Sequence, residues 1–449
     1  MKLKKPKISA PESLDCEKAN RFTRTFRIEV VTPIYGGGVV AGEPDAEMPI
    51  RASAIRGQLR FWWRLLNRSK YSTSTDLFRE ERKIWGGMSS TATGNSSLIK
   101  LRVSGVTKPN QQSCAKYPPR TDGSYQTYAN FPYGPGYVLF PGQGKAPNRN
   151  GEYENEPKRI IVPPFSFELE LSLWKADSNT NVELWKNDVL PALRWWASFG
   201  GIGARTRRGM GSVKVPELQP VSDEDLTKAK VKLAKQGTNH SSAKNAWEAA
   251  ITRLRDFRQG AGIGRNHGSG RIPAGRSRWP EADSIRDITG CHFQSTAKTH
   301  APAHPARIAF PRAVFGLPII THFKDGPPNR ARDEDKPRFD PEDTTLLPIL
   351  ENETTTRNRL ASPLILKAMW TGKDYVPIAL LLPHDHVYEM SLQLTGAVNR
   401  QFAPGEWWSE PARKAMVSGK TANPLHHRPP NQIRTGDVLD DFLRFFEGK

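Results

Sequence analysis

Alternation of apolar and polar residues near the start of the chain predicts a β-strand over residues 22–31. Phe26, Ile28 and Val30 fall on one side of this segment, and Pro33 ends it. Side chains of a strand point alternately to its two faces, so this pattern indicates one buried and one exposed face. A similar alternation predicts a strand over residues 160–174.

Residues 55–66 have the periodicity of an amphipathic helix. Ile55, Leu59, Trp62 and Leu66 are spaced i, i+4, i+7 and i+11, which places them on one helical face. Ser53 is the predicted N-cap. A glycine-rich loop over residues 35–49 separates this helix from the first strand.

A second helix is expected from about Val182, with a kink or restart at Pro191 and its end at Gly200. A short strand is expected over residues 210–215. Strands and helices therefore mix along the first half of the chain, which indicates an α+β fold.

The second half repeats these element types. The pattern predicts helices over 247–257 and 438–446, the latter starting at Asp437, and strands over 307–320, 360–370 and 375–382. A chain of 449 residues is too long for one core. The acidic run 222–225 marks a boundary, so we expect domains over 1–220 and 221–449.

Several segments do not fit the strand and helix patterns. An insertion over about 104–158 is rich in Pro, Gly, Tyr and Asn, and seven aromatic residues lie between Tyr117 and Phe140. It is either a disordered loop or an ordered excursion that contacts a partner. Further polar loops are expected over about 259–305, 321–345 and 399–433.

The charge of the chain points to a polyanionic partner. There are 66 Lys and Arg against 46 Asp and Glu, a formal net charge of +20. Nucleic acid is the natural ligand for such a surplus. The apolar runs at 363–366 and 378–382 are far too short to span a bilayer, and the basic N-terminus leads into polar sequence, so we expect a cytoplasmic protein.

Neither a metal site nor a cofactor is expected. The three cysteines are widely separated and form no CxxC pair, which argues against a zinc knuckle and a disulfide framework. His384 and His386 are close together, but no third ligand accompanies them.

Arginines recur at every fourth position of the first predicted helix, at Arg56, Arg60, Arg64 and Arg68. Residues at this spacing lie along one side of a helix. They form either a solvated face or a track for phosphates. No acid lies between Arg51 and Arg68, which favours the phosphate track. We expect Gly57 of the same helix to contact RNA as well.

The segment 201–211, Gly-Ile-Gly-Ala-Arg-Thr-Arg-Arg-Gly-Met-Gly, fails the tests for known phosphate loops. Position 206 is Thr where a dinucleotide-binding turn has glycine, and a P-loop would need Gly-Lys-Ser/Thr. It is either an ordinary glycine-rich turn or a loop that lets amides approach an anionic backbone. We favour the second, with these residues in contact: Gly201, Gly203, Arg205, Arg207, Arg208, Gly209 and Gly211.

Tryptophans beside arginines are typical of proteins that bind single-stranded RNA, because bases stack on the rings. Trp62 and Trp196 fall on apolar helical faces and are expected in the core. Trp63 and Trp279 are the better candidates for stacking.

The sequence indicates no catalytic residue. The loop after the first strand holds Glu43, Asp45 and Glu47 without a histidine, and spaced carboxylates in such a loop usually serve solvation. Nuclease activity through Asp45 stays open as an alternative.

In combination, four motifs resemble the RAMP superfamily of CRISPR effector proteins: TPIYGGG, RASAIRGQLRFWWR, the E-x-x-x-W-G-G of residues 81–87, and GIGARTRRGMG. Three further segments, RSRWPEAD, PRAVFGLPI and RLASPLILK, are similar to the first subunit of the type III-B (Cmr) module. The resemblance covers most of the chain, except the insertion and the segment 423–431.

The resemblance implies two ferredoxin-like (RRM-related) domains and an RNA-binding, non-catalytic role. It implies a place among the other Cmr subunits, where the chain holds the 3′ part of the guide RNA and helps capture target RNA. The second half would extend the RNA track through Arg276, Arg278 and Arg359, and Arg51 would join the helix arginines.

Two further readings stay open. In one, Asp45 makes the chain an RNA-cleaving enzyme; in the other, the chain is a purely structural bridging subunit whose arginines meet acidic proteins. A guide-processing endoribonuclease is disfavoured, because such enzymes commonly use a histidine near the first helix and residues 22–70 contain none.

Overall fold

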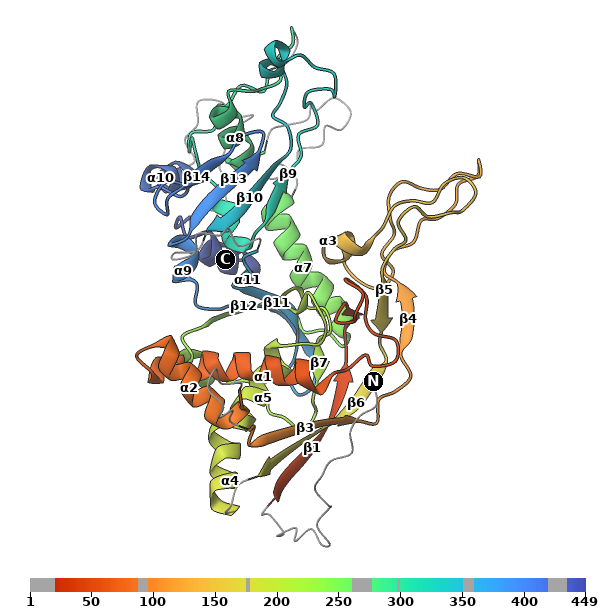
Figure 1. The fold of residues 1–449 in the computed structure, drawn as a ribbon, viewed down its shortest axis with the longest axis vertical. Coiled ribbons are helices and arrows are strands. Elements are labelled where there is room, and N and C mark those ends of the chain that lie inside the picture. Colours follow the sequence, from red (N-terminus) through yellow and green to blue (C-terminus); the bar gives the residue numbers. More distant parts are fainter. Residues whose placement is uncertain are drawn as a thin grey trace, which may run out of the picture.

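The computed structural model describes residues 21–87, 96–174, 178–260, 277–296, 299–349, 359–418 and 434–449. Sheets and helices are stacked along the long axis of an elongated molecule, and a long arm projects to one side (Figure 1). The mixture of helices and strands confirms the α+β class.

The first half is built on a four-stranded antiparallel sheet with strand order β3-β6-β1-β7. Its strands are β1 (Arg21–Val30), β3 (Ile99–Ser104), β6 (Phe165–Trp174) and β7 (Val213–Lys214). Helix α1 (Ala52–Asn67) connects β1 to β3, and α5 (Leu190–Phe199) connects β6 to β7. The sequence order is therefore β-α-β-β-α-β.

The predicted alternation of β1 places its apolar residues against the helices. Phe26, Ile28 and Val30 are buried with α1 and α5, whereas the intervening positions carry Arg, Thr and Glu. The outward side of β1 is thus polar, and Glu29 pairs with Lys214 of β7 at 3.1 Å.

Several predicted element boundaries differ from the structure. The segment 160–174 forms two strands, β5 (Arg159–Val162) and β6, because Pro163 and Pro164 between them have no N–H to donate to a ladder. Residues 210–215 contribute only the two-residue strand β7. Ser53 lies inside α1, whose N-cap is Arg51.

The helix expected from Val182 is present, with the predicted irregularity. It runs as α4 (Ser178–Leu184), one π-helical turn (Trp185–Val189) and α5, which begins just before Pro191. Pro191 cannot donate to the preceding turn, which accounts for the local change of hydrogen bonding. Helix α2 (Ser74–Trp85) packs beside α1.

A three-stranded sheet of the second half lies against the first half. Its order is β11-β12-β8, from β8 (Lys232–Lys235), β11 (Leu364–Trp370) and β12 (Tyr375–Leu381). One face of β11 packs with Leu364 and Leu366 on α7 (Ala243–Gln259), and the other packs with Ile365 and Met369 in the core of the first half. The central sheet is therefore buried on both sides.

Helix α11 (Val438–Glu447) also packs on α7. As predicted, its N-cap is Asp437, whose side chain accepts hydrogen bonds from the amides of Leu439 and Asp440.

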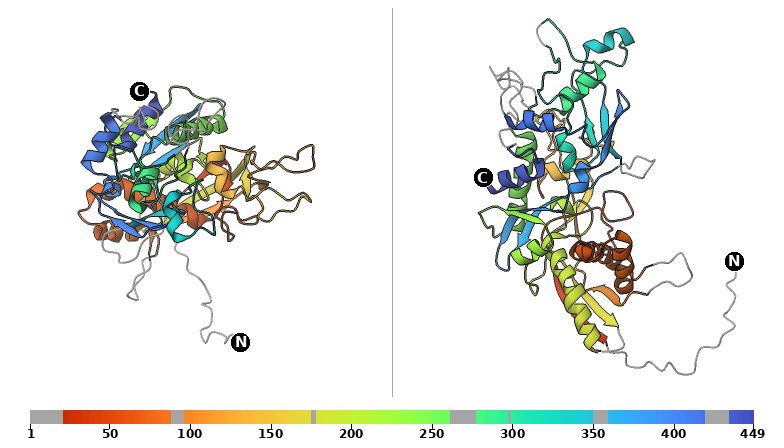
Figure 2. Two further views of the ribbon diagram at one scale, coloured as in Figure 1. Left: turned by 90° about the horizontal axis from the view of Figure 1, so that it is seen from above. Right: turned by 90° about the vertical axis from the view of Figure 1, so that its left-hand side faces the viewer.

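A second sheet occupies the far end of the molecule, with order β14-β13-β10-β9. It contains β9 (Ile319–Thr321), β10 (Thr344–Ile349), β13 (Ser391–Gly396) and β14 (Arg400–Phe402), with α8 (Glu281–Thr289) and α10 (Glu410–Ser418) nearby (Figure 2). The short helix α9 (Asp385–Tyr388) precedes β13.

The predicted strand over 307–320 was wrong. Residues 311–315 form a 3-10 helix, and only 319–321 are extended, because Pro311 and Pro318 interrupt any ladder. The predicted loops are also not wholly irregular, since α8 lies in 259–305 and α10 in 399–433.

The insertion over 104–158 forms an arm that projects from the first sheet (Figure 1). It carries β4 (Asn110–Ser113), which pairs with β5, and the short helix α3 (Gly136–Leu139). Backbone hydrogen bonds between Lys116 and Asn130 close its outer part. Of the two possibilities left open by the sequence, the structure favours the ordered excursion.

Candidate nucleic-acid interface

The glycine-rich loop joins α5 to β7 and lies against the loop that follows β1. Ala204 donates its amide hydrogen to the Tyr35 carbonyl at 2.7 Å, and Gly211 donates to Pro33 at 2.8 Å. The two glycine-rich segments are therefore far apart in sequence but adjacent in the fold.

Close packing within the protein accounts for several of the glycines. A Cβ on Gly211 would lie 2.0 Å from the Ile202 carbonyl oxygen, and one on Gly209 would lie 2.5 Å from the Trp247 ring. Both residues have positive φ, and Gly201 is buried beside them. These glycines are required by contacts to the chain itself, and so is the partly exposed Gly203, where a Cβ would lie 2.7 Å from the Tyr35 carbonyl oxygen.

Arg208 and Arg207 fasten this loop to the central sheet. Arg208 donates to the carbonyls of Leu364 at 2.8 Å and Phe315 at 3.2 Å, and burial lowers its pKa to about 10. Arg207 donates to the Ser362 carbonyl and lies over the Phe61 ring. Both guanidinium groups bond to neutral oxygens, so their positive charge is not neutralised by these contacts.

Arg205 is the cation of this loop that is best placed for a ligand. It is half-buried, it adopts a left-handed conformation with φ 57°, and its Nε is buried without a hydrogen-bond partner. Burial lowers the pKa of Arg205, while the nearby hydroxyl groups of Tyr35 and Tyr137 oppose this shift. A desolvated charge of this kind is unfavourable unless an anion compensates it.

Lys367 is a further basic residue at the start of this loop, which the sequence analysis missed. It lies on β11, is fully buried, and donates to the Gly200 carbonyl at 2.9 Å. Burial lowers its pKa to about 7. A single lysine within an apolar strand gives no periodic signal, so only the fold shows that it meets the start of the glycine-rich loop.

Two arginines of α1 are paired with an acidic residue of α2. Glu81 of α2 is buried, and its Oε1 accepts hydrogen bonds from Arg60 at 2.5 Å and Arg64 at 2.6 Å. Arg68 donates to the Ala229 carbonyl and Arg56 to that of Ile99. The side chains of Arg60 and Arg64 remain 25% and 41% exposed, so they keep a surface that an anion can reach.

Gly57 lies on the exposed side of α1, where a Cβ would meet nothing within 4 Å. The helix backbone is thus open to close approach at this point. That feature suits a ligand that passes over α1.

The stacking role predicted for Trp63 and Trp279 was wrong. Both side chains are only 1% exposed. The Trp63 indole donates to Asp188, and that of Trp279 donates to the Arg258 carbonyl, so both are core residues with satisfied polar ends. Trp62 and Trp196 are buried as expected.

Asp45 organises the loop that precedes α1. It accepts hydrogen bonds from the amides of Met48 and Glu47, both at 3.0 Å, and pairs with Arg51 at 3.1 Å. These bonds lower the pKa of Asp45, with the amide of Met48 the largest contribution. The Arg51 guanidinium therefore already has a carboxylate partner, and its side chain remains 36% exposed.

Residues of the second half are only partly placed. Arg359 is exposed and Arg278 is half-buried, while Arg276 lies outside the described residues. Arg207 of the glycine-rich loop donates to the Ser362 carbonyl, three residues after Arg359.

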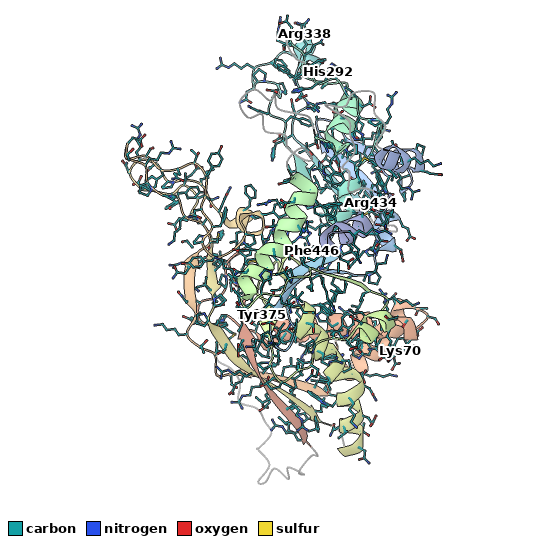
Figure 3. The ribbon with its side chains drawn as sticks, turned by 180° about the vertical axis from the view of Figure 1, so that it is seen from behind. Lys70, His292, Arg338, Tyr375, Arg434 and Phe446 are labelled. Atoms are coloured by element: carbon teal, nitrogen blue, oxygen red, sulfur yellow. The ribbon has the colours of Figure 1, made fainter. Side chains whose placement is uncertain are left out.

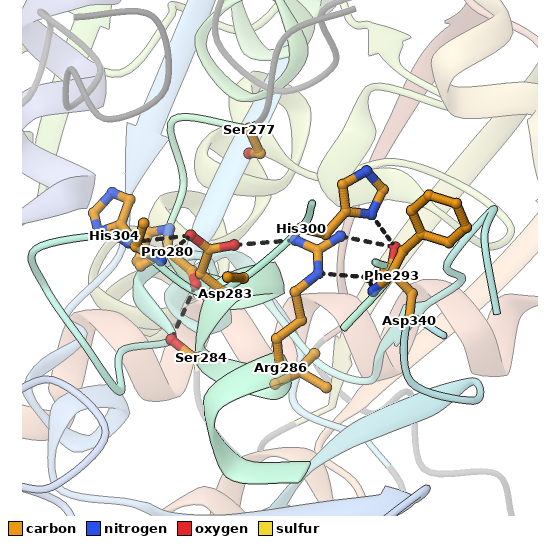
Figure 4. A network of polar contacts seen from close by, with 12 residues as sticks. Ser277, Pro280, Asp283, Ser284, Arg286, Phe293, His300, His304 and Asp340 are labelled. Carbon is orange, nitrogen blue, oxygen red and sulfur yellow. Dashed lines mark hydrogen bonds and ion pairs between the residues drawn. The ribbon is translucent and has the colours of Figure 1, made fainter. Parts of the chain in front are cut away.

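One cluster of the second half has metal-ligand composition: His300, Asp325 and Asp340. Arg286 donates to both carboxylate oxygens of Asp340, at 2.8 and 3.0 Å, and also bonds to Asp283 (Figure 4). Since the guanidinium already neutralises Asp340, the cluster fits a structural ion-pair network better than a cation site.

In the parts of the chain that the structure describes, no helix is long and apolar enough to cross a bilayer.

Comparison with known proteins points to one superfamily. Residues 27–214 match the family model of the RAMP superfamily. The CRISPR system Cmr subunit Cmr1-2 of Pyrococcus furiosus is 24% identical over 201 residues, which cover 44% of this chain and 97% of that protein.

One similar solved structure is the apo form of Cmr1 from Pyrococcus furiosus, which is 19% identical to this chain with a TM-score of 0.31. The match covers 81% of this chain and 88% of that one. A chain of the type III-B Cmr-beta complex bound to cognate target RNA has 12% identity and a TM-score of 0.36, with 85% and 96% covered.

Proposed function

We propose that this chain is an RNA-binding subunit of a type III-B CRISPR (Cmr) effector complex, because residues 27–214 match the family model of the RAMP superfamily. In this role it holds the 3′ part of a guide RNA, a target RNA, or both, beside other Cmr subunits in the cytoplasm. The relative named above is a Cmr subunit, and one similar chain belongs to a complex bound to target RNA.

The observation that carries the proposal is the uncompensated charge at Arg205. It lies with Arg207 and Arg208 in the glycine-rich loop, where the contacts described above are to neutral oxygens and rings. Phosphates of RNA would neutralise this group of cations from outside. Such contacts position a strand without reading its sequence, so base pairing of the guide would supply specificity.

The exposed part of α1 extends this surface. The buried Glu81 accepts hydrogen bonds from Arg60 and Arg64. Because a guanidinium has five N–H donors, each of these arginines can bind Glu81 and a phosphate together. Arg51, Arg56 and Gly57 would continue the same path. Arg276, Arg278 and Arg359 of the second half stay part of the proposal as a separate contact.

We further interpret both halves as ferredoxin-like domains. In the first half, the β-α-β-β-α-β order and the strand order β3-β6-β1-β7 support this interpretation. In the second, the order β11-β12-β8 with α7 after β8 corresponds to the first three strands of the same unit. The outward side of β1 carries no aromatic residue, so RNA would contact the loops instead of stacking on this strand.

The non-catalytic role rests on the surroundings of Asp45. Its carboxylate is committed to two amides and to Arg51, and its lowered pKa makes it a poor general base near neutral pH.

The test is equilibrium binding of the full chain to labelled single-stranded RNA, with gel analysis of the RNA after incubation. We expect Arg205→Ala to weaken binding at least several-fold, and Arg79→Ala, which removes an exposed, ion-paired arginine, to leave it unchanged. Intact RNA supports the proposal. Equal binding by both variants would favour the bridging subunit, and cleavage lost in Asp45→Ala would make the chain a nuclease.

A further inference from the structure

A cavity of about 1030 Å³ lies beside the end of β1 and the loop that follows it. Three segments line it: the ends of β1 and β6, the base of the arm, and the first turn of α7. Tyr375, labelled in Figure 3, closes it from β12. The site is thus built where the two halves of the chain and the arm meet.

The floor of this cavity is apolar. Val31, Pro132, Pro163 and Pro164 line it and are not fully buried, whereas the side chains of Val30 and Phe165 pack into the core of the first half. Tyr133 and Tyr375 present aromatic rings at the walls. Such surfaces bind a nucleobase through its face without selecting its identity.

Polar groups gather at the rim. Asn110, Ser241 and Ser242 line the opening, and the side chain of Ser242 makes no capping bond to α7 although it occupies the N-cap position. Hydroxyl and amide groups in these positions can bond to the edge of a base or to a ribose hydroxyl.

The charge of the rim is positive. Arg27 and Lys244 contribute cations, and the lining acid, Glu29, is already paired with Lys214 at 3.1 Å. Lys244 contacts Glu248 at 3.6 Å and the Pro132 carbonyl at 3.2 Å, and it remains exposed.

We propose that this cavity receives one nucleotide of a single-stranded RNA, with its base on the apolar floor and its phosphate at Arg27 and Lys244. The inference rests on the proposed function and goes beyond it, since none of the RNA-binding residues named above lines the cavity. A paired base could not enter, so the nucleotide belongs to an unpaired part of the strand. A protein side chain is the competing occupant.

The test is photocrosslinking of the full chain to oligouridine RNA that contains 4-thiouridine, followed by peptide mapping. We expect crosslinks in segments 132–133, 163–166 or 241–244 of the wild type. Ser242→Trp, which fills the cavity without removing a capping bond, should reduce them at least tenfold, while Ser72→Trp at an exposed position should not.

A second variant tests the cavity independently, in case Ser242→Trp does not fold. Lys244→Ala should lower RNA affinity several-fold, and Lys414→Ala, an exposed lysine with the same i,i+4 pairing to a glutamate, should not. Normal, Arg205-dependent RNA binding without crosslinks in these segments would overturn this inference alone. Absence of RNA binding by the wild type would overturn the proposed function as well.

Discussion

At the scale of single residues, the glycine-rich loop combines two kinds of arginine. Arg208 is buried and bonds to two carbonyls, so it holds the loop on the central sheet. Arg205, by contrast, has a buried Nε without a hydrogen-bond partner. The sequence alone cannot distinguish the three arginines of this loop. Their burial and hydrogen bonding depend on β11, which lies more than 150 residues further along the chain.

Arg205→Met should therefore separate stability from binding. Replacing a half-buried, unpaired cation by an apolar side chain of similar length removes a desolvation penalty, so we expect the thermal midpoint to stay equal or rise. RNA affinity should fall in the same variant. Differential scanning fluorimetry and RNA binding on one preparation test this; a marked fall in the midpoint would show a structural role instead.

Lys367 should make stability depend on pH. Its pKa of about 7 in the folded protein lies below the usual value of 10.5, so between these values the unfolded chain holds more protons. The contribution of Lys367 to stability is consequently lowest below pH 7 and increases as the pH rises towards 10. Lys367→Met should flatten the rise of the thermal midpoint between pH 7 and 9, and the exposed Lys228→Met should leave the slope unchanged.

At the scale of elements, sequence patterns could not show which residues pair with the arginines of α1. The sequence patterns correctly predicted β1, α1, α7, α11, β11 and β12, since β1 alternates, the helices have an apolar repeat, and β11 and β12 are nearly continuous apolar runs. The partner of Arg60 and Arg64 is Glu81 on α2, outside the segment whose acids were counted. Trp63 and Trp279 were misjudged for the same reason, because their partners come from other elements.

Glu81→Gln should destabilise the pairing of α1 with α2. Loss of the charge leaves two guanidinium groups with a weaker acceptor in a buried position, which we expect to cost about 1–3 kcal/mol. A thermal midpoint lower than that of Glu80→Gln, whose carboxylate is on the same helix and partly exposed, would agree with this. An unchanged midpoint would mean that Glu81 does not hold these arginines.

At the scale of the whole molecule, the net charge of +20 and the cations of the glycine-rich loop favour a polyanion. The domains expected over 1–220 and 221–449 share a buried sheet, because β11 contributes to both cores. Composition and charge indicate a nucleic-acid ligand, whereas the packing of the two halves on each other depends on contacts between strands distant in sequence.

The salt dependence of binding to single-stranded RNA tests the central claim most directly. Each phosphate contact should add about 0.7 to the steepness of log affinity against log salt concentration. We predict a steep decline for the wild type and a slope shallower by about 0.7 for Arg205→Met, with no change for Arg79→Met. Binding that is independent of salt, or slopes that are equal in all three proteins, would contradict the account.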